Sequence, residues 1–128
     1  KSSVKALTDG KGVDVIYDPV GGELFDACLR SLAWRGRLLV IGFASGEIPK
    51  APANLPLLKG SSIVGVFWGS FTQHEPAAHM ENMQELVAGF ADGSLRPHIG
   101  HVFPLDEAAA AMNVLASRQA MGKVVVEI

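Results

Sequence analysis

The sequence lacks the features that mark secreted, membrane-spanning and nucleic-acid-binding proteins. Its 128 residues include one cysteine, Cys28, which excludes an internal disulfide and favours a reducing compartment, so a cytoplasmic location is expected. No apolar run approaches the roughly 20 residues of a membrane span, and no signal peptide is visible. With 11 basic and 13 acidic residues and no basic cluster, the chain is not expected to bind nucleic acid.

The sequence also lacks G-x-G-x-x-G, the loop that binds dinucleotide phosphates. Even so, residues 13–47 have the order of elements found in a nucleotide-binding sheet. An apolar, β-branched segment at 13–17 predicts a strand, residues 24–32 have the apolar spacing of an amphipathic helix, and residues 37–41 predict a second strand. A strand, a helix and a strand within about 30 residues imply a right-handed crossover between parallel strands.

The rest of the chain continues the alternation of helices and strands, and its composition, 48% hydrophobic and 19% charged, is that of a folded protein. Three prolines favour an extended loop over residues 49–58. The predicted class is therefore α/β with a parallel sheet. The further predicted elements are a helix tail at 2–8, a third strand at 62–68, a helix at 76–90, a strand at 99–103, a helix at 105–116 and a closing strand at 122–128.

Two glycine-containing loops follow the first two predicted strands: DPVGG at residues 18–22 and GFASG at residues 42–46. If the strands are parallel, both loops lie at the carboxyl edge of the sheet, where open α/β sheets bind ligands. On local sequence alone, the first loop could also be a plain strand-to-helix turn. The second loop nearly matches the nucleophile elbow G-x-S-x-G, but Ser45 comes one place late and a proline-rich segment follows instead of a helix, which disfavours a serine hydrolase.

The histidines do not have the spacing of a zinc site. His74 and His79 are five residues apart, whereas the zinc motif H-E-x-x-H uses a spacing of four to place both rings on one helix face. His98 and His101 flank strand residues and should not converge. Surface histidines and no metal site are therefore expected.

Four stretches in register carry a resemblance to a known family: GVDVIYDPVGG, GRLLVIGFASGEIP, SIVGVFWGSF and GKVVVEI. Together they resemble the medium-chain dehydrogenase/reductase superfamily, and most of all its zinc-free NADPH:quinone oxidoreductase branch, the zeta-crystallin-like enzymes. The resemblance spans essentially the whole chain. It implies the second half of a Rossmann-type sheet with flanking helices, plus a C-terminal segment that returns to the catalytic domain.

The resemblance also assigns positions beside a nicotinamide cofactor. It places residues of the first two loops and of the end of the third strand along the cofactor, and two basic residues near its phosphates. Without the resemblance, the basic residues would be read as solvated and the tryptophan as a core or edge aromatic. The implied cofactor-binding residues are Val20, Gly21, Phe43, Ala44, Ser45, Val66, Phe67, Trp68, Arg118 and Lys123.

The implied function is an oxidoreductase that transfers hydride from NADPH, or from NADH, to a quinone or an α,β-unsaturated carbonyl. Alternatives on the same scaffold are an enoyl or acryloyl thioester reductase and a zinc-type alcohol dehydrogenase. An alternative of another class is a non-catalytic interaction module. The resemblance further implies a homodimer that pairs through the edge strand from Ile63 to Trp68, because an apolar edge needs covering.

The first residue is not Met and the opening residues look like the end of a helix, so we expect a piece of a longer protein. On that expectation, residues 1–95 would be the C-terminal half of the cofactor-binding domain and residues 96–128 a segment of the catalytic domain. The phosphate loop would then precede this chain, and the chain alone would be inactive. No residue within it is an evident general acid. The sequence leaves open the acceptor and the choice between NADPH and NADH.

Overall fold

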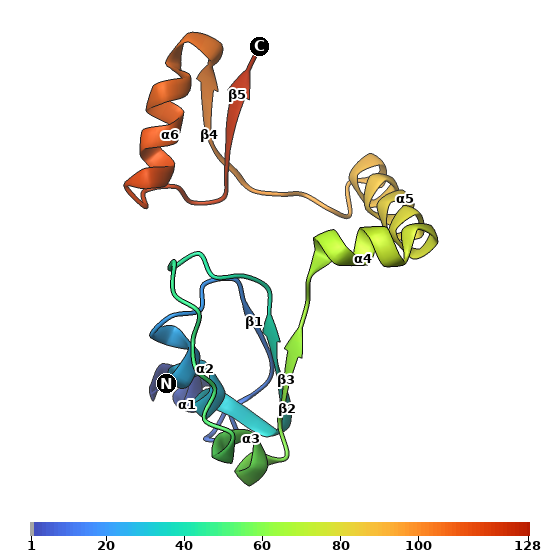
Figure 1. The fold of residues 1–128 in the computed structure, drawn as a ribbon. Helices are drawn as coiled ribbons and strands as arrows, with labels where there is room; N and C mark the ends of the chain where they lie inside the picture. Colours follow the sequence, from blue (N-terminus) through green and yellow to red (C-terminus); the bar gives the residue numbers. More distant parts are fainter. Residues whose placement is uncertain (1) are drawn as a thin grey trace. The chain divides into compact units, whose positions relative to one another are not determined.

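A computed structural model of the chain describes residues 2–128. The chain forms two compact units, of which the first ends at His74 and the second runs from Glu75 to Ile128 (Figure 1). Within residues 2–128, none of the helices is both long enough and apolar enough to cross a membrane. Each unit is an α/β arrangement built around parallel strands, which confirms the predicted fold class.

The first unit is a three-stranded parallel sheet with the strand order β1-β2-β3. Helix α2 connects the first two strands, so the predicted strand–helix–strand crossover is confirmed. In the sheet of this unit β3 pairs only with β2, as expected for an edge strand. The elements are α1 (Ser2–Leu7), β1 (Val13–Asp18), α2 (Leu24–Ser31), β2 (Leu32–Val40), α3 (Asn54–Lys59), β3 (Ser62–Gly65) and α4 (Trp68–His74).

Strand β2 begins five residues earlier than predicted and contains an irregularity near its start. Val13 of β1 pairs with Leu32, but Val15 pairs with Arg37, so two steps along β1 correspond to five along β2. The intervening residues include Arg35, which has a left-handed φ of 61°. The residues between Leu32 and Arg37 therefore form a bulge within the strand, and regular pairing resumes at Arg37.

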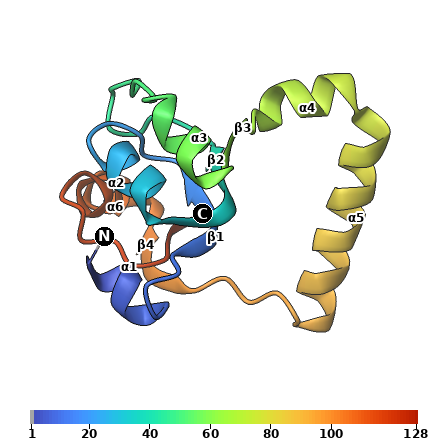
Figure 2. The same ribbon diagram turned by 90° about the horizontal axis from the view of Figure 1, so that it is seen from below.

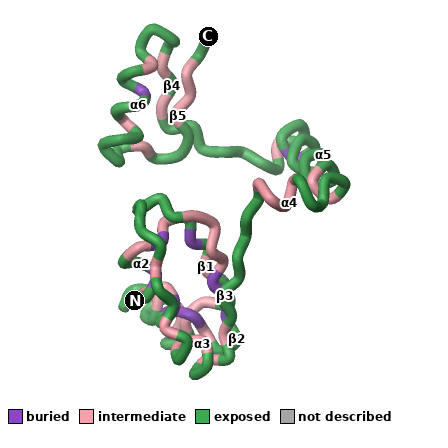
Figure 3. Tube along the Cα trace, in the orientation of Figure 1, coloured by how far each residue is buried: buried purple, intermediate pink, exposed green. Residues whose placement is uncertain are grey.

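The core of the first unit lies between α2 and the sheet. Its buried members are Phe25 and Leu29 from one face of α2, together with Leu32 and Leu38 from β2 (Figure 3). The helical spacing of Phe25 and Leu29 predicted this packing. Helices α2 and α3 contact each other and both contact β2 (Figure 2).

The predicted extended loop at residues 49–58 is wrong in its second half, which is helix α3. Proline does not prevent this helix, because Pro56 occupies the first turn of α3, where a backbone N–H would have no helical acceptor. Leu55 packs against the core, and Gly60 ends the helix in the left-handed conformation. Lys59 extends from α3 and donates hydrogen bonds from Nζ to two main-chain oxygens, of Arg30 at 2.8 Å and of Leu32 at 2.5 Å. These oxygens belong to the junction of α2 and β2.

The predicted third strand at residues 62–68 is also too long, because β3 ends at Gly65. Its partner β2 ends at Val40, so only Val66 N–H still finds an acceptor there, the Val40 oxygen at 2.9 Å. Phe67 then accepts a hydrogen bond from Phe71 N–H at 3.0 Å, which opens the turn of α4. Trp68 is thus the first residue of a helix and not the end of a strand.

The second unit begins with α5 (Pro76–Asp92), which confirms the predicted helix at 76–90 and is followed by Gly93 in the left-handed conformation. Strands β4 (Ile99–Pro104) and β5 (Lys123–Glu127) then pair in parallel, and α6 (Ala108–Ala116) contacts both. The predicted helix at 105–116 starts as a 3-10 turn, Leu105–Glu107, before α6 begins.

Candidate cofactor site

The DPVGG loop is organised by the carboxylate that opens it. Asp18 is the last residue of β1 and only 5% of its surface is exposed. Its Oδ1 accepts hydrogen bonds from the backbone N–H of Val20 and of Gly21, each at 2.9 Å. This is the Asx-type arrangement in which an aspartate holds the backbone that follows it. Gly21 and Gly22 then adopt left-handed φ values of 65° and 59°.

The loop that follows β2 is hydrogen-bonded to the DPVGG loop along its length. Ile41 N–H donates to the Asp18 main-chain oxygen at 2.9 Å, Ala44 N–H to that of Pro19 at 3.1 Å, and Ser45 N–H to that of Val20 at 3.0 Å. In the opposite direction, Gly22 N–H donates to the Glu47 oxygen at 3.3 Å. The two loops therefore form one continuous layer at the carboxyl edge of the sheet.

Side chains of the second loop also pack closely against the two glycines of the first loop. A Cβ on Gly21 would lie 3.0 Å from Phe43 Cδ1, and a Cβ on Gly22 would lie 2.7 Å from Ser45 Oγ. The Ser45 hydroxyl is itself held locally, since its oxygen accepts a hydrogen bond from Glu47 N–H at 3.2 Å. Ser45 thus serves the geometry of the loop, which agrees with the rejection of a nucleophile elbow. The glycines are required here because any side chain would push the loops apart.

Apolar surface borders this layer. Phe43 is 40% exposed in the second loop, and Val66, held to the end of β2, is 39% exposed. Beyond it, Phe67 and Trp68 are 78% and 64% exposed at the start of α4. An exposed apolar rim at the carboxyl edge of a parallel sheet is suited to the flat face of a ring.

Two of the predicted residues belong to the second unit. Arg118 follows α6 with a left-handed φ of 58°, and its side chain is exposed. Lys123 is the first residue of β5. Its backbone N–H donates to the His98 main-chain oxygen at 2.8 Å, and its side chain is exposed. The two basic residues flank the turn between α6 and β5.

A pocket of about 340 Å³ opens beside the two loops, on the side of α2. It is lined by three carboxylates, Glu23, Asp26 and Glu47, and by one basic residue, Lys50. This excess of negative charge disfavours a phosphate, so the pocket is not suited to the anionic part of a dinucleotide.

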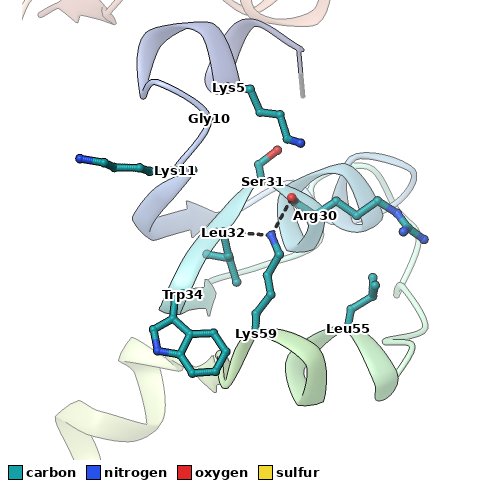
Figure 4. Close-up of a pocket in the computed structure, with 10 residues that line it drawn as sticks. Lys5, Gly10, Lys11, Arg30, Ser31, Leu32, Trp34, Leu55 and Lys59 are labelled. Atoms are coloured by element: carbon teal, nitrogen blue, oxygen red, sulfur yellow. Dashed lines mark hydrogen bonds between the residues drawn. The ribbon is translucent and has the colours of Figure 1, made fainter.

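A second pocket, of about 360 Å³, lies at the opposite, amino edge of the sheet, next to Gly12 and Leu32 (Figure 4). Four basic residues line it, but Figure 4 shows that Lys11 and Arg30 direct their charges away from its centre. Arg30 pairs with Asp26, with 2.7 Å between Nε and Oδ2. The ammonium of Lys59 points inward and is bonded to main-chain oxygens, so this pocket is a structural junction.

The only cysteine, Cys28, lies on α2 and is partly buried against the core. Burial, and to a smaller degree the negative charge of Asp18, raises the pKa of its thiol. A raised pKa lowers the thiolate fraction at neutral pH, which is the reverse of an activated nucleophile.

Residues 1–126 match the family model described as "Zinc-binding dehydrogenase". The chain belongs to this family. A quinone oxidoreductase-like protein 2 homolog from Nematostella vectensis is 42% identical over 127 residues, covering 98% of this chain and 35% of that protein. Prostaglandin reductase-3 from Bos taurus is 36% identical over 132 residues, covering 92% of this chain and 35% of that protein.

Among solved structures, a mycobacterial protein in complex with NADPH superposes with a TM-score of 0.81 and 30% identity, over 99% of this chain and 39% of that one. The predicted resemblance to the medium-chain dehydrogenase/reductase superfamily is thereby confirmed. The chain spans about a third of the length of the curated relatives it matches.

The family description implies zinc, but the described residues do not fit a zinc site. Over the part of the chain that the structure describes, no three His, Cys, Asp or Glu side chains are grouped so that they could hold a metal ion. His101 instead stacks against Phe103, with ring centroids 6.2 Å apart.

A nicotinamide cofactor fits the carboxyl edge better, because exposed apolar side chains adjoin the two loops there. The structure brings five predicted residues together in the two loops: Val20, Gly21, Phe43, Ala44 and Ser45. Val66 adjoins the end of β2, and Phe67 and Trp68 follow it into α4.

Sequence reasoning missed Asp18, although the signal was present. An aspartate directly before a Pro-x-Gly-Gly turn is typical of a side chain that accepts hydrogen bonds from the next residues. It also missed Gly22 and Glu47, whose backbones join the loops, because that contact depends on the register of two distant loops.

Proposed function

We propose that this chain supplies the nicotinamide-side edge of the cofactor site in an NADPH-dependent oxidoreductase that reduces a quinone or an α,β-unsaturated carbonyl. The observation that carries the proposal is the pair of interlocked loops at the carboxyl edge, with exposed Phe43 and Val66 beside them. The NADPH held by a structural neighbour and the names of the relatives support it. NADH is the second candidate cofactor.

The proposed roles follow the position of each residue. Val20 and Gly21 present backbone close to the ring, Phe43 to Ser45 line the nicotinamide half, and Val66 to Trp68 border the carboxamide. When bound, NADPH supplies the hydride, and the chain orients the ring and excludes water around it. Lys123, with Arg118 as a weaker candidate, is proposed to approach the cofactor phosphates, since both are exposed cations in the second unit.

We further propose that residues 1–95 form the cofactor-binding part and residues 96–128 the catalytic part, and that the protein is cytoplasmic. We also propose a homodimer that forms through the edge strand. The exposure of all four residues of β3 and the pairing of β3 on one side only support it.

A second candidate is an enoyl or acryloyl thioester reductase, favoured by the similarity to a solved structure named an enoyl reductase. A third is a zinc-type alcohol dehydrogenase, supported by the family description "Zinc-binding dehydrogenase". A non-catalytic module is the candidate of another class. The deciding experiment titrates a full-length protein containing this chain with NADPH and NADH, and then measures NADPH oxidation with a quinone and an enoyl thioester in parallel.

Turnover of the quinone is the expected result. Turnover of the thioester alone would move the assignment to the thioester reductase, and oxidation of an alcohol that stops when zinc is chelated would move it to the zinc enzyme. Failure to bind either nucleotide would overturn the oxidoreductase assignment and favour the interaction module.

A further inference from the structure

We propose that Asp18 is a positioning residue whose buried carboxylate fixes both loops at the carboxyl edge and so determines how tightly the nicotinamide cofactor binds. The inference rests on the function proposed above, because it assigns a role in that same site. Asp18 is not proposed to touch the cofactor. It acts through the backbone that the cofactor would meet.

The Asp18 carboxylate fixes the backbone of its own loop by hydrogen bonds. One carboxylate oxygen, Oδ1, receives both the Val20 and the Gly21 N–H groups at 2.9 Å. This fixes the turn at the point where the backbone enters the left-handed conformation of Gly21. Hydrogen bonds to a charged acceptor are roughly twice as strong as neutral ones, so a carboxylate holds this turn more firmly than an amide would.

The loop that Asp18 fixes is in turn hydrogen-bonded to the loop after β2. The Val20 main-chain oxygen accepts a hydrogen bond from Ser45 N–H at 3.0 Å, and the Pro19 oxygen accepts one from Ala44 N–H at 3.1 Å. Asp18 also accepts one from Ile41 N–H, through its own main-chain oxygen. A displacement of the first loop must therefore displace residues 41–45, which carry three of the predicted cofactor-binding residues.

Burying the carboxylate of Asp18 is energetically costly. Fully buried aspartates are rare because removing a carboxylate from water is expensive unless hydrogen bonds compensate. Only 5% of the surface of Asp18 is exposed. Its carboxylate accepts hydrogen bonds from the loop that follows it, at Val20 and Gly21, and not from another element of the core. A residue chosen for packing alone would be apolar at this position.

The test uses a full-length protein containing this chain and three variants, Asp18→Ala, Asp18→Asn and Asp14→Asn. Asp14 is the matched control, since it lies on the same strand, is exposed and carries the same charge. The measurements are the NADPH dissociation constant by fluorescence titration, the melting temperature, and amide hydrogen exchange of peptides covering residues 19–22 and 41–47.

We expect Asp18→Ala to raise the dissociation constant at least about tenfold and Asp18→Asn to raise it about threefold, as for losing or weakening a hydrogen bond. Exchange should accelerate in both loops but not at residues 37–40 of β2, and Asp14→Asn should match the parent protein. If Asp18→Ala does not fold, Asp18→Asn decides the matter by the same two readouts.

A folded Asp18 variant with the parent's dissociation constant, or with weaker binding but unchanged exchange at residues 41–47, would overturn the inference. A parent protein that binds no nicotinamide nucleotide would overturn the proposed function instead. The exchange comparison would then still show whether Asp18 holds both loops.

Discussion

The hydroxyl oxygen of Ser45 lies 2.7 Å from the point where a Cβ on Gly22 would stand, although the two residues belong to loops that follow different strands. The absence of a side chain on one loop is thus matched by a polar side chain on the other. The contact makes the two loops a single structural unit at the carboxyl edge, and it provides the first test.

Gly22→Ala should destabilise the protein and disturb the cofactor edge. The change adds a clash with Ser45 to the cost of a left-handed alanine, and we expect a loss of about 2–4 kcal/mol of unfolding free energy. Gly46→Ala is the control, because Gly46 also has a positive φ but has open space around its Cβ position, so it should lose only about 1–2 kcal/mol. Chemical denaturation of both variants measures the difference, and equal losses would contradict the steric lock.

Lys59→Met should weaken the junction of α2 and β2. The change keeps the length and apolar stem of the side chain but removes the donors to the Arg30 and Leu32 oxygens, so we expect a loss of about 1–3 kcal/mol. Lys11→Met is the control, since Lys11 lines the same pocket with its side chain directed away from Lys59 (Figure 4). Denaturation midpoints that shift equally in the two variants would show that the hydrogen bonds of Lys59 do not stabilise the fold.

Cys28 should react slowly with alkylating reagents near neutral pH. Burial, and secondarily Asp18, raises the pKa of the thiol, so the reactive thiolate is scarcer in the folded chain than in the unfolded one. The raised pKa also means that this group contributes stability below its unfolded pKa, and that the contribution is lost as pH rises through the folded pKa.

The pH profile of iodoacetamide labelling at the Cys28 peptide, followed by mass spectrometry, measures this effect with and without denaturant. The folded profile should lie at higher pH. Asp18→Asn should move it partly back, since it removes the smaller of the two causes. A folded profile at or below the denatured one would contradict the prediction.

Trp68→Ala, in a full-length protein containing this chain, should raise the dissociation constant of NADPH about five- to tenfold, because a large exposed aromatic at the proposed carboxamide edge would be lost. Trp34→Ala is the matched control, since Trp34 is a tryptophan of similar exposure, 71% against 64%, that lines the pocket at the opposite edge. Fluorescence titration compares the two. An unchanged constant for Trp68→Ala would remove the start of α4 from the site.

The purified 128-residue chain should not oxidise NADPH in the steady state with a quinone present. It contains no G-x-G-x-x-G loop to hold the dinucleotide phosphates, and the charged residues that line the pocket beside its loops are mostly carboxylates. NADPH absorbance followed over time is the measurement, with the full-length protein as the positive control. Steady oxidation by the short chain would contradict this account.

The sequence predicted the parts of the fold that depend on local pattern. The spacing of Phe25 and Leu29 revealed the buried face of α2, and the apolar runs revealed the parallel strands. It failed where an outcome depends on a partner. Strand β3 stops early because β2 ends at Val40, and the prolines concealed α3, whose stability comes from Leu55 in the core and Lys59 at the α2 end.

The candidate site, too, could be predicted from the sequence only in part. The two glycine-containing loops and their common edge follow from parallel strands, so the placement of Gly21 and Ser45 at one edge could be predicted from the sequence. The hydrogen bonds that join the loops could not, because they depend on the register between strands. Asp18 was overlooked because an aspartate at a strand end is usually solvated, and its burial is a tertiary effect.

The bulge in β2 has a consequence for how this fold can change over evolution. Regular pairing with β1 resumes at Arg37. A change in the number of residues between Leu32 and Arg37 can therefore be absorbed within the bulge, without shifting the pairing of the second half of the strand. Insertions or deletions in that short segment would alter the amino edge and leave Leu38 to Val40, and the loop they carry, in place. The two ends of the sheet are thereby free to diverge at different rates.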